Sequence, residues 1–201
     1  MSKTPKLPLA GQHGYSLIEV LLVIGIIAVV SAFALPMTAG AMADLRSRGD
    51  ARAVSNIVAL AKMRATSGFT RARVFVDLTG RSFFIQILDK ATNTWVSEGV
   101  TTSLSTGVSF GFSGLATPPP DTQLAIGQSA ACLDDDGDPI GNSACIVFSS
   151  RGIPIDALGA PTGDNGLYIT DGIRVYATTV TATPLVRLWW SPASSPEWVR
   201  Q

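Results

Sequence analysis

A long apolar run near the N-terminus constrains the fold more than any other feature of this chain. From Ser16 to Ala43 the sequence holds a single charged residue, Glu19. About 20 apolar residues are enough to cross a bilayer as a helix, so the run predicts one membrane-spanning helix over about residues 15–36. Because a charge inside such a span costs at least about 2.5 kcal/mol, Glu19 is expected to have a function.

A short polar segment precedes this run and contains Lys3, Lys6 and His13. An ordinary secretory signal is cleaved after its apolar stretch, at small residues. Here the junction with the character of a cleavage site, Gly14-Tyr15, comes before the stretch. Positive charges before the span, with no acidic residue preceding Glu19, predict that this segment stays in the cytoplasm and that the C-terminal part crosses the membrane.

The hexapeptide Gly14-Tyr15-Ser16-Leu17-Ile18-Glu19 resembles the processing site of type IV pilins and type II secretion pseudopilins. In that family a prepilin peptidase cuts after the glycine and N-methylates the new terminus, and glutamate is the fifth mature residue. The resemblance implies that residues 1–14 are a leader, that Tyr15 becomes the methylated N-terminus and that Glu19 guides assembly. Tyr15 replaces the usual phenylalanine, and Pro36 stands where these helices commonly carry proline and predicts a bend.

The expected role of Glu19 is electrostatic. After cleavage Tyr15 would carry a free amine close to hydrocarbon, and an ionised Glu19 on the same or a neighbouring subunit could pair with that amine. Since an unpaired charge is costly in a medium of low dielectric constant, this pair would favour one axial register between subunits. The alternative is a glutamate that only extends to the lipid headgroups.

After the apolar run the pattern stays helical as far as Ser67-Gly68, where a helix end is predicted. The charges between Asp44 and Arg52 are spread round the helix, which predicts a stretch exposed to solvent on most sides. Four apolar residues then recur at helical spacing and predict packing on a globular domain: Val54, Ile57, Val58 and Ala61. Residues 15–67 are therefore expected to form one helix, half in the membrane and half in the domain.

Beyond Gly68 the apolar pattern has a period of two, which is typical of strands. Many short strands separated by Gly, Pro and Thr predict an antiparallel sheet domain over residues 68–201. The expected strands are Val74–Leu78, Phe83–Leu88, Trp95-Val96, Gly107–Phe112, Gln123–Ile126, Ala144–Phe148, Leu167–Ile169, Ile173–Thr179 and Leu185–Trp190. The tail 191–201 is expected to fray, although Trp198 could dock. The predicted fold class is α+β and pilin-like, a long N-terminal helix packed on an antiparallel sheet, and the layout resembles the GspH/FimT branch of the pseudopilins.

Composition argues against catalysis and against a general affinity for nucleic acid. Lys plus Arg and Asp plus Glu number 15 each, so the formal net charge is zero. The only histidine, His13, lies in the expected leader, which leaves the mature chain without an imidazole for a catalytic triad. We predict that the protein is not an enzyme and needs no cofactor. Cys132 and Cys145 suit an oxidising periplasm as one disulfide closing a short loop, and two free thiols are the alternative.

Two weaker patterns suggest ligands. Asp134, Asp136 and Asp138 resemble the opening of a calcium loop, in which carboxylate oxygens alternate along the chain. An EF-hand needs glycine after the third aspartate and a later glutamate, whereas Pro139 follows here, so a solvated acidic turn is the favoured interpretation.

The second pattern concerns DNA, which FimT-like minor pilins bind through a Gly-Arg-x-Arg motif near the C-terminus. Here Pro184-Leu185-Val186-Arg187 keeps only the last arginine of that motif. Phosphate binding needs several cations on one face, and Arg174, Arg187 and Arg200 make a small set. DNA is therefore not an expected partner.

Together these patterns predict a minor pseudopilin of the GspH/FimT type in a type II secretion system. Such a protein would be clipped after Gly14, anchored by one span in the bacterial inner membrane and placed at or near the pseudopilus tip, with its C-terminal domain in the periplasm. The expected partners are other pseudopilins or pilins, the prepilin peptidase and the inner-membrane assembly platform, with secreted cargo as a further candidate. The alternative is a FimT-like minor pilin of a type IV pilus that serves DNA uptake.

Overall fold

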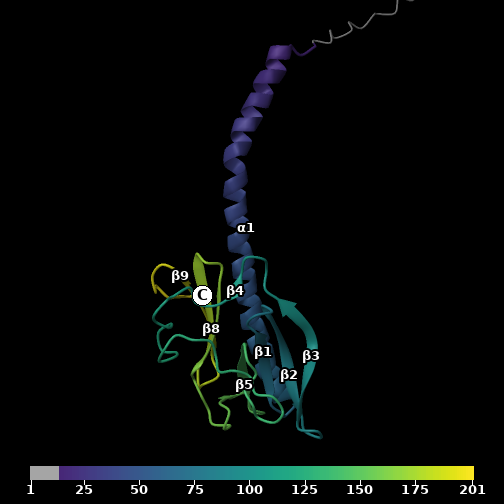
Figure 1. Ribbon diagram of the computed structural model, residues 1–201, viewed down its shortest axis with the longest axis vertical. Helices are drawn as coiled ribbons and strands as arrows, with labels where there is room; N and C mark the ends of the chain where they lie inside the picture. The colour runs from purple at the N-terminus through teal and green to yellow at the C-terminus, as the bar shows by residue number, and fades with distance from the viewer. Residues whose placement is uncertain (1–13) are drawn as a thin grey trace, which may run out of the picture. The chain divides into compact units, whose positions relative to one another are not determined.

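The chain forms one long helix and two antiparallel β-sheets (Figure 1). The computed structural model describes residues 14–201, and for residues 35–39 it describes the backbone alone. Helix α1 (Leu17–Ser67) ends where Ser67-Gly68 predicted. Two compact units divide the chain, one ending at Met42 and the other comprising Ala43–Gln201, and α1 contributes to both. Of the leader, Lys3, Lys6 and His13 lie outside the described residues.

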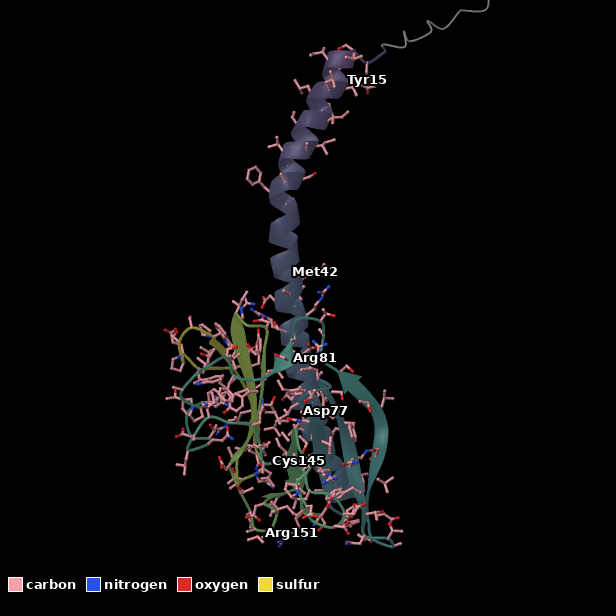
Figure 2. All side chains as sticks on the ribbon, viewed as in Figure 1. Tyr15, Met42, Asp77, Arg81, Cys145 and Arg151 are labelled. Atoms are coloured by element: carbon pink, nitrogen blue, oxygen red, sulfur yellow. A yellow bond between two sulfur atoms is a disulfide. The ribbon has the colours of Figure 1, made fainter. Side chains whose placement is uncertain are left out.

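In the first unit α1 exposes apolar side chains on every side. The window Leu17–Ala34 has a mean hydropathy of 2.8 and none of its residues is buried. Among the described residues it is the one stretch long and apolar enough, by length and composition, to span a membrane. The backbone stays helical through Pro36. Figure 2 shows the side chains projecting from this part of the helix, with Tyr15 at its start.

The second unit contains a five-stranded sheet with the order β3-β2-β1-β5-β6, in which all neighbours are antiparallel. Its strands are β1 (Ala72–Asp77), β2 (Ser82–Asp89), β3 (Thr94–Ser103), β5 (Ser143–Phe148) and β6 (Pro154–Ile155). In the central register Val74 lies opposite Ile85 on one side and Ile146 on the other. These three side chains are buried because alternate residues of a strand share one face, here the face on the core.

A second five-stranded sheet has the order β10-β9-β8-β7-β4, again antiparallel throughout. Its strands are β4 (Ser109–Phe110), β7 (Asn165–Thr170), β8 (Arg174–Val180), β9 (Val186–Pro192) and β10 (Val199–Arg200). The predicted α+β class, a helix packed on antiparallel sheet, is confirmed, although the strands form two sheets rather than one.

The main core lies where the last turns of α1 meet both sheets. The helix contributes small and β-branched residues at helical spacing, namely Ala51, Val54, Val58, Ala61 and Ala65, all fully or almost fully buried. A second cluster covers the other face of the β8–β9 sheet and contains Tyr168 and Trp189, with Phe112 and Trp198 packed against it. The prediction that Val54, Val58 and Ala61 pack on a globular domain is confirmed.

The predicted strand at Gln123–Ile126 is wrong, because this segment is an irregular loop. Its polar groups are satisfied by side chains rather than by a strand ladder. Gln123 donates to the carbonyl of Gly127, 3.0 Å away, and accepts a hydrogen bond from the buried hydroxyl of Tyr168. Ile126 packs against the second cluster. An apolar residue at the right spacing therefore anchors a loop here.

The prediction of a frayed tail is also wrong. The tail turns back so that β10 pairs with β9, with Val199 opposite Trp190. The indole N–H of Trp198 donates to the carbonyl of Thr117 over 2.9 Å, and the Ser191 hydroxyl accepts from the backbone N–H of Glu197. Docking of the large Trp198 ring on the second cluster offsets the conformational entropy that a free tail would keep.

Candidate functional site

The expected cleavage junction, Gly14-Tyr15, lies in irregular backbone just before α1. Apart from Gly14 and its two chain neighbours, no described atom lies within 4 Å of the position that a Cβ of Gly14 would occupy, and Tyr15 is 83% exposed. Helical backbone is shielded by its own hydrogen bonds, whereas an exposed irregular peptide can enter a protease cleft in extended form. The geometry therefore leaves this peptide bond accessible.

Ser16 and Glu19 together start the helix. The backbone N–H of Glu19 donates to the Ser16 carbonyl over 3.1 Å and lies 3.3 Å from the Ser16 hydroxyl oxygen, the bond of a helix N-cap. The sequence Ser16-Leu17-Ile18-Glu19 also has the spacing of a capping box, a local signal separate from the charge of Glu19 in the apolar run. Glu19 also places a carboxylate in the first turn, where the helix dipole favours negative charge.

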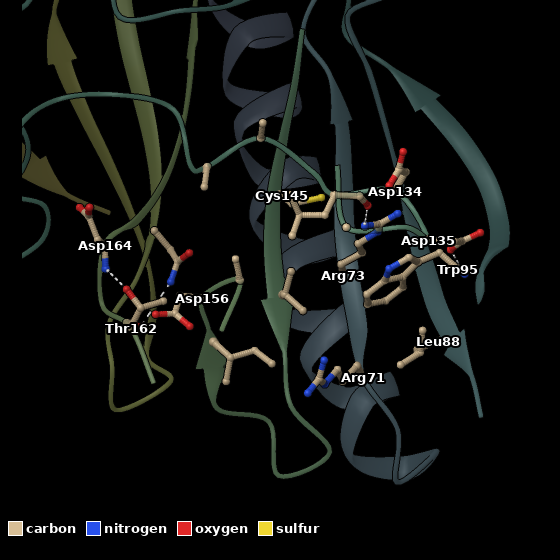
Figure 3. A pocket seen from close by; sticks show the side chains of 18 of the residues that line it. Arg71, Arg73, Leu88, Trp95, Asp134, Asp135, Cys145, Asp156, Thr162 and Asp164 are labelled. Atoms are coloured by element: carbon tan, nitrogen blue, oxygen red, sulfur yellow. Dashed lines mark hydrogen bonds between the residues drawn. The ribbon is translucent and has the colours of Figure 1, made fainter. Parts of the chain in front are cut away.

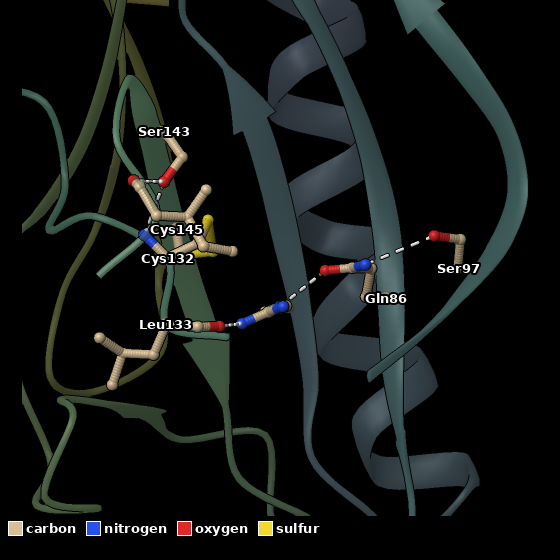
Figure 4. The surroundings of a disulfide bond; sticks show 8 residues. Gln86, Ser97, Cys132, Leu133, Ser143 and Cys145 are labelled. Atoms are coloured by element: carbon tan, nitrogen blue, oxygen red, sulfur yellow. Dashed lines mark hydrogen bonds between the residues drawn. A yellow bond between two sulfur atoms is a disulfide. The ribbon is translucent and has the colours of Figure 1, made fainter. Parts of the chain in front are cut away.

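Cys132 and Cys145 form a disulfide that joins a surface loop to β5 (Figure 4). The bond closes a loop across a sequence separation of 13 residues. Ser143 supports the same junction, since its hydroxyl accepts from the backbone N–H of Cys132 and donates to the carbonyl of Ile140. The loop is thus attached to the sheet at both of its ends.

The three alternating aspartates proposed for calcium do not act alike. Asp134 Oδ1 accepts from the backbone N–H groups of Asp136 and Asp138, at 3.0 and 2.8 Å, and so caps its own turn. Within residues 14–201 no group of three or more acidic, histidine or cysteine side chains is placed to hold a metal ion. The spacing in the sequence therefore forms a hydrogen-bonded turn, and calcium binding here is not proposed.

Arg174, a DNA candidate, is held in ion pairs inside the second unit. Its Nη1 lies 2.6 Å from Asp44 Oδ1 and 3.9 Å from Asp171 Oδ2. Asp44 also pairs with Arg48, at 3.0 Å. Asp50 accepts from the backbone N–H and the hydroxyl of Ser105, which again ties α1 to the domain. Residues 44–52 are exposed on most sides, as predicted, but the face that contains these two aspartates packs on the domain.

Arg187 is not brought near Arg174. In the β8–β9 register Arg174 lies opposite Pro192 and Arg187 opposite Thr179, which places the arginines about 17 Å apart along the strands. They also occupy opposite faces, since Arg174 shares a face of β8 with Tyr176 of the main core, whereas Arg187 shares a face of β9 with Trp189 of the second cluster. The two arginines therefore do not form one phosphate-binding surface.

The sequence did not single out Arg73, which the structure buries. Arg73 is 3% exposed, and its guanidinium lies 4.1 Å from the ring centroid of Trp95. Nε donates to Gln86 Oε1 over 2.8 Å and Nη1 donates to the carbonyl of Leu133. The only sequence feature that could have drawn attention to Arg73 is a cation within an apolar strand. Its burial could not be predicted from this feature, because the loop that covers it is 60 residues away in the sequence.

Comparison with protein families matches residues 9–35 to the prokaryotic N-terminal methylation motif. No curated protein matches the sequence. One similar solved structure is the minor pseudopilin EpsH from the type 2 secretion system of Vibrio cholerae, 14% identical, covering 71% of this chain and 95% of that chain with a TM-score of 0.45. A crystal structure of EpsH from the same organism is 13% identical, covers 69% of this chain and 89% of that chain, and has a TM-score of 0.41.

The methylation motif contains Gly14, Tyr15 and Glu19. The resemblance of the N-terminal segment to type IV pilin-like proteins is therefore confirmed over residues 9–35. In the described part of this segment, an exposed peptide bond precedes a capped helix whose apolar side chains are uncovered.

Proposed function

We propose, with the N-terminal methylation motif as the premise, that this chain is a minor pseudopilin. It would act as a structural subunit at or near the tip of a type II secretion pseudopilus, promoting assembly and secretion rather than catalysing a reaction. The observation that carries the proposal is the motif at the start of a helix whose apolar side chains, over Leu17–Ala34, are covered by no other part of the chain that the structure describes. Such a surface needs lipid before assembly and neighbouring helices afterwards.

Cleavage after Gly14 would place the new amine on Tyr15, two residues before the first residue of α1. A positive charge at a helix N-terminus opposes the helix dipole, and a carboxylate in the first turn offsets it. Glu19 occupies that turn. In a filament the same carboxylate could pair with the amine of a neighbouring subunit, so that local capping and register between subunits depend on one side chain.

The proposed location is the bacterial inner membrane, with a single span and the domain 43–201 in the periplasm. The Cys132–Cys145 bond suits this location because disulfides persist in oxidising compartments. The proposed partners are the prepilin peptidase, the assembly platform and other pseudopilins or pilins, with secreted cargo as a candidate. A FimT-like role in DNA uptake has less support, since Arg174 is ion-paired and Arg187 lies on the other face.

Mass spectrometry of the full-length chain, extracted from membranes with and without a prepilin peptidase, tests the processing step. With the peptidase we expect a mature N-terminus at Tyr15 carrying one N-methyl group. Without it, residues 1–14 should remain attached. A start other than Tyr15 in the presence of the peptidase would refute the assignment.

Two matched substitutions separate the charge of Glu19 from its place in the helix cap. Glu19→Gln keeps the size and removes the charge, and we expect it to reduce incorporation into the filament, measured by crosslinking to neighbouring subunits. Ser16→Ala removes the cap hydroxyl and keeps the charge, and we expect incorporation to persist. Normal incorporation of Glu19→Gln would remove the assembly role.

Deletion of the gene then distinguishes the two filaments. Loss of protein secretion with normal twitching motility supports the pseudopilus. Loss of twitching or DNA uptake with normal secretion would instead assign the chain to a type IV pilus.

A further inference from the structure

A cleft of about 660 Å³ opens on the face of the β1–β5 sheet that points away from the core (Figure 3). Its floor includes Arg73 and Val147, which alternate with the buried core residues of β1 and β5. Its two walls come from the loop 133–137, next to the disulfide, and from the segment 156–165. The volume lies within the range of protein ligand sites.

Arg73 brings unused hydrogen-bond donors to this cleft. A guanidinium has five N–H groups, and those on Nε and Nη1 supply the bonds to Gln86 and Leu133. Nη2 has no acceptor within the described part of the chain, although the side chain is 3% exposed. Burial lowers the pKa of Arg73 to about 10, although the negative charges of Asp135 and Asp134 act to raise it. The guanidinium is therefore protonated at neutral pH. Nη2 is not one of the fully buried polar atoms that lack a partner, so it keeps access to the cleft. A ligand in the cleft could therefore offer an acceptor to this charged donor.

The walls of the cleft are acidic. Five aspartates and two arginines line it, which gives a net charge of −3 at neutral pH. The aspartates are Asp134, Asp135, Asp136, Asp156 and Asp164, and none of them forms an ion pair among residues 14–201.

Two of these carboxylates accept no hydrogen bond from the described part of the chain. Asp134 and Asp156 accept backbone hydrogen bonds within their own turns, and Asp135 accepts from the N–H of Trp95. The side chains of Asp136 and Asp164 accept no such bond in the described chain, and they belong to opposite walls. They are therefore free to meet a cation.

We propose that this cleft binds a basic, extended segment of a partner polypeptide. Cationic side chains of that segment would lie against Asp136 on one wall and Asp164 on the other, and a main-chain carbonyl would accept from Nη2 of Arg73. An anionic segment would gain the same donor but would face the net negative charge of both walls. An extended segment carries a carbonyl at every residue and side chains on alternate sides, so it can offer both kinds of group along the cleft.

The site could serve cargo or a neighbouring subunit, so it does not depend on the proposed assembly role. The test uses the full chain in detergent micelles and two fluorescent peptides, acetyl-Gly-Lys-Gly-Lys-Gly-amide and its analogue with glutamate in place of lysine. Anisotropy at low ionic strength should show binding of the lysine peptide and weakening as salt is added. No binding of the lysine peptide up to 5 mM, or equal binding of the glutamate peptide, would overturn the proposal.

Aspartate variants from one loop supply the matched control. Asp136→Asn and Asp164→Asn should each weaken binding, by up to about fivefold, the upper end for one exposed ion pair. Asp138→Asn removes the same charge from the same loop but outside the cleft, and it should change affinity less. Equal weakening by Asp138→Asn and Asp136→Asn would mean that only the general field of the loop attracts the peptide, which would overturn the site.

A fourth variant tests the donor. Arg73→Lys keeps the charge and loses the guanidinium geometry. At the same ionic strength it should lower the affinity for the lysine peptide, although the net charge of the cleft is unchanged. Thermal unfolding establishes whether this variant is folded. A folded Arg73→Lys variant that binds the lysine peptide like the wild type would remove Arg73 from the site. If Arg73→Lys does not fold, the aspartate variants still test the acidic walls.

Discussion

Removal of the Cys132–Cys145 disulfide should destabilise the domain by an amount that the loop length sets. The bond closes a loop across a separation of 13 residues, and loop-closure entropy for such a loop is worth about 3 kcal/mol at 25 °C. Cys132 is fully buried and Cys145 nearly so, and alanine keeps both positions apolar. The double variant Cys132→Ala, Cys145→Ala should therefore lose about 3 kcal/mol of unfolding free energy.

A loss of this size is measurable without abolishing the fold. Domains of ordinary stability unfold with about 5–15 kcal/mol, so the variant should remain folded at 25 °C. The native contacts near the bond also predict where loosening begins. The loop contributes the Leu133 carbonyl that accepts from Arg73, and Ser143 bonds both the Cys132 N–H and the Ile140 carbonyl beside it.

Urea unfolding of the full chain in micelles, followed by tryptophan fluorescence, is a suitable assay. All four tryptophans lie in the unit 43–201, so the signal reports that unit. The slope of unfolding free energy against urea concentration should increase in the double variant, because an unfolded chain without the crosslink exposes more surface. Reduction of the wild type should reproduce the loss and leave the double variant unchanged. A variant as stable as the oxidised wild type would refute the argument from loop closure.

Three further predictions concern the domain. Val58→Ala should cost about 2 kcal/mol of unfolding free energy because Val58 is fully buried, whereas Met63→Ala, at a site 57% exposed, should stay within about 0.5 kcal/mol. Gly152→Ala should cost at least about 1 kcal/mol, since φ is +74° and the new Cβ would lie 2.9 Å from Thr66 Cγ2, and urea unfolding measures it. Burial raises the pKa of Asp171 but backbone N–H bonds lower it more, so its folded-state pKa is depressed. Its stabilisation is therefore present at neutral pH and is lost below about pH 4, and the wild type should approach Asp171→Asn in acid.

Much of the fold followed from local patterns. The apolar run and the spacing of Val54, Val58 and Ala61 predicted the helix as far as Ser67. The alternation after Gly68 predicted strands at Val74–Leu78 and Phe83–Leu88, and these correspond to the antiparallel neighbours β1 and β2. The segment 123–126 shows the limit of such patterns. Its spacing suits a strand, but no neighbouring strand pairs with it. A side-chain hydrogen bond between Gln123 and Tyr168 holds the segment instead.

The candidate sites divide in the same way. Gly14, Tyr15 and Glu19 belong to six consecutive residues, and these lie within residues 9–35, which match the prokaryotic N-terminal methylation motif. Arg174 and Arg187 looked like one small basic set, yet the strand register places them at opposite ends and on opposite faces of the sheet. The charge of Arg174 is balanced by Asp44, 130 residues earlier in the chain.

What the sequence determined by itself is the apolar N-terminal helix, the methylation motif and the class of the domain, because hydrophobic length, helical spacing and strand alternation act between near neighbours. Only the tertiary structure decided that Arg73 is buried beneath the Leu133 loop, that the tail docks through Trp198 on Thr117 and that two acidic walls face one another across a cleft. These features join residues 60 or more positions apart or depend on which loop covers a sheet. Desolvation and pairing at such places are set by packing of the whole domain, which no local pattern specifies.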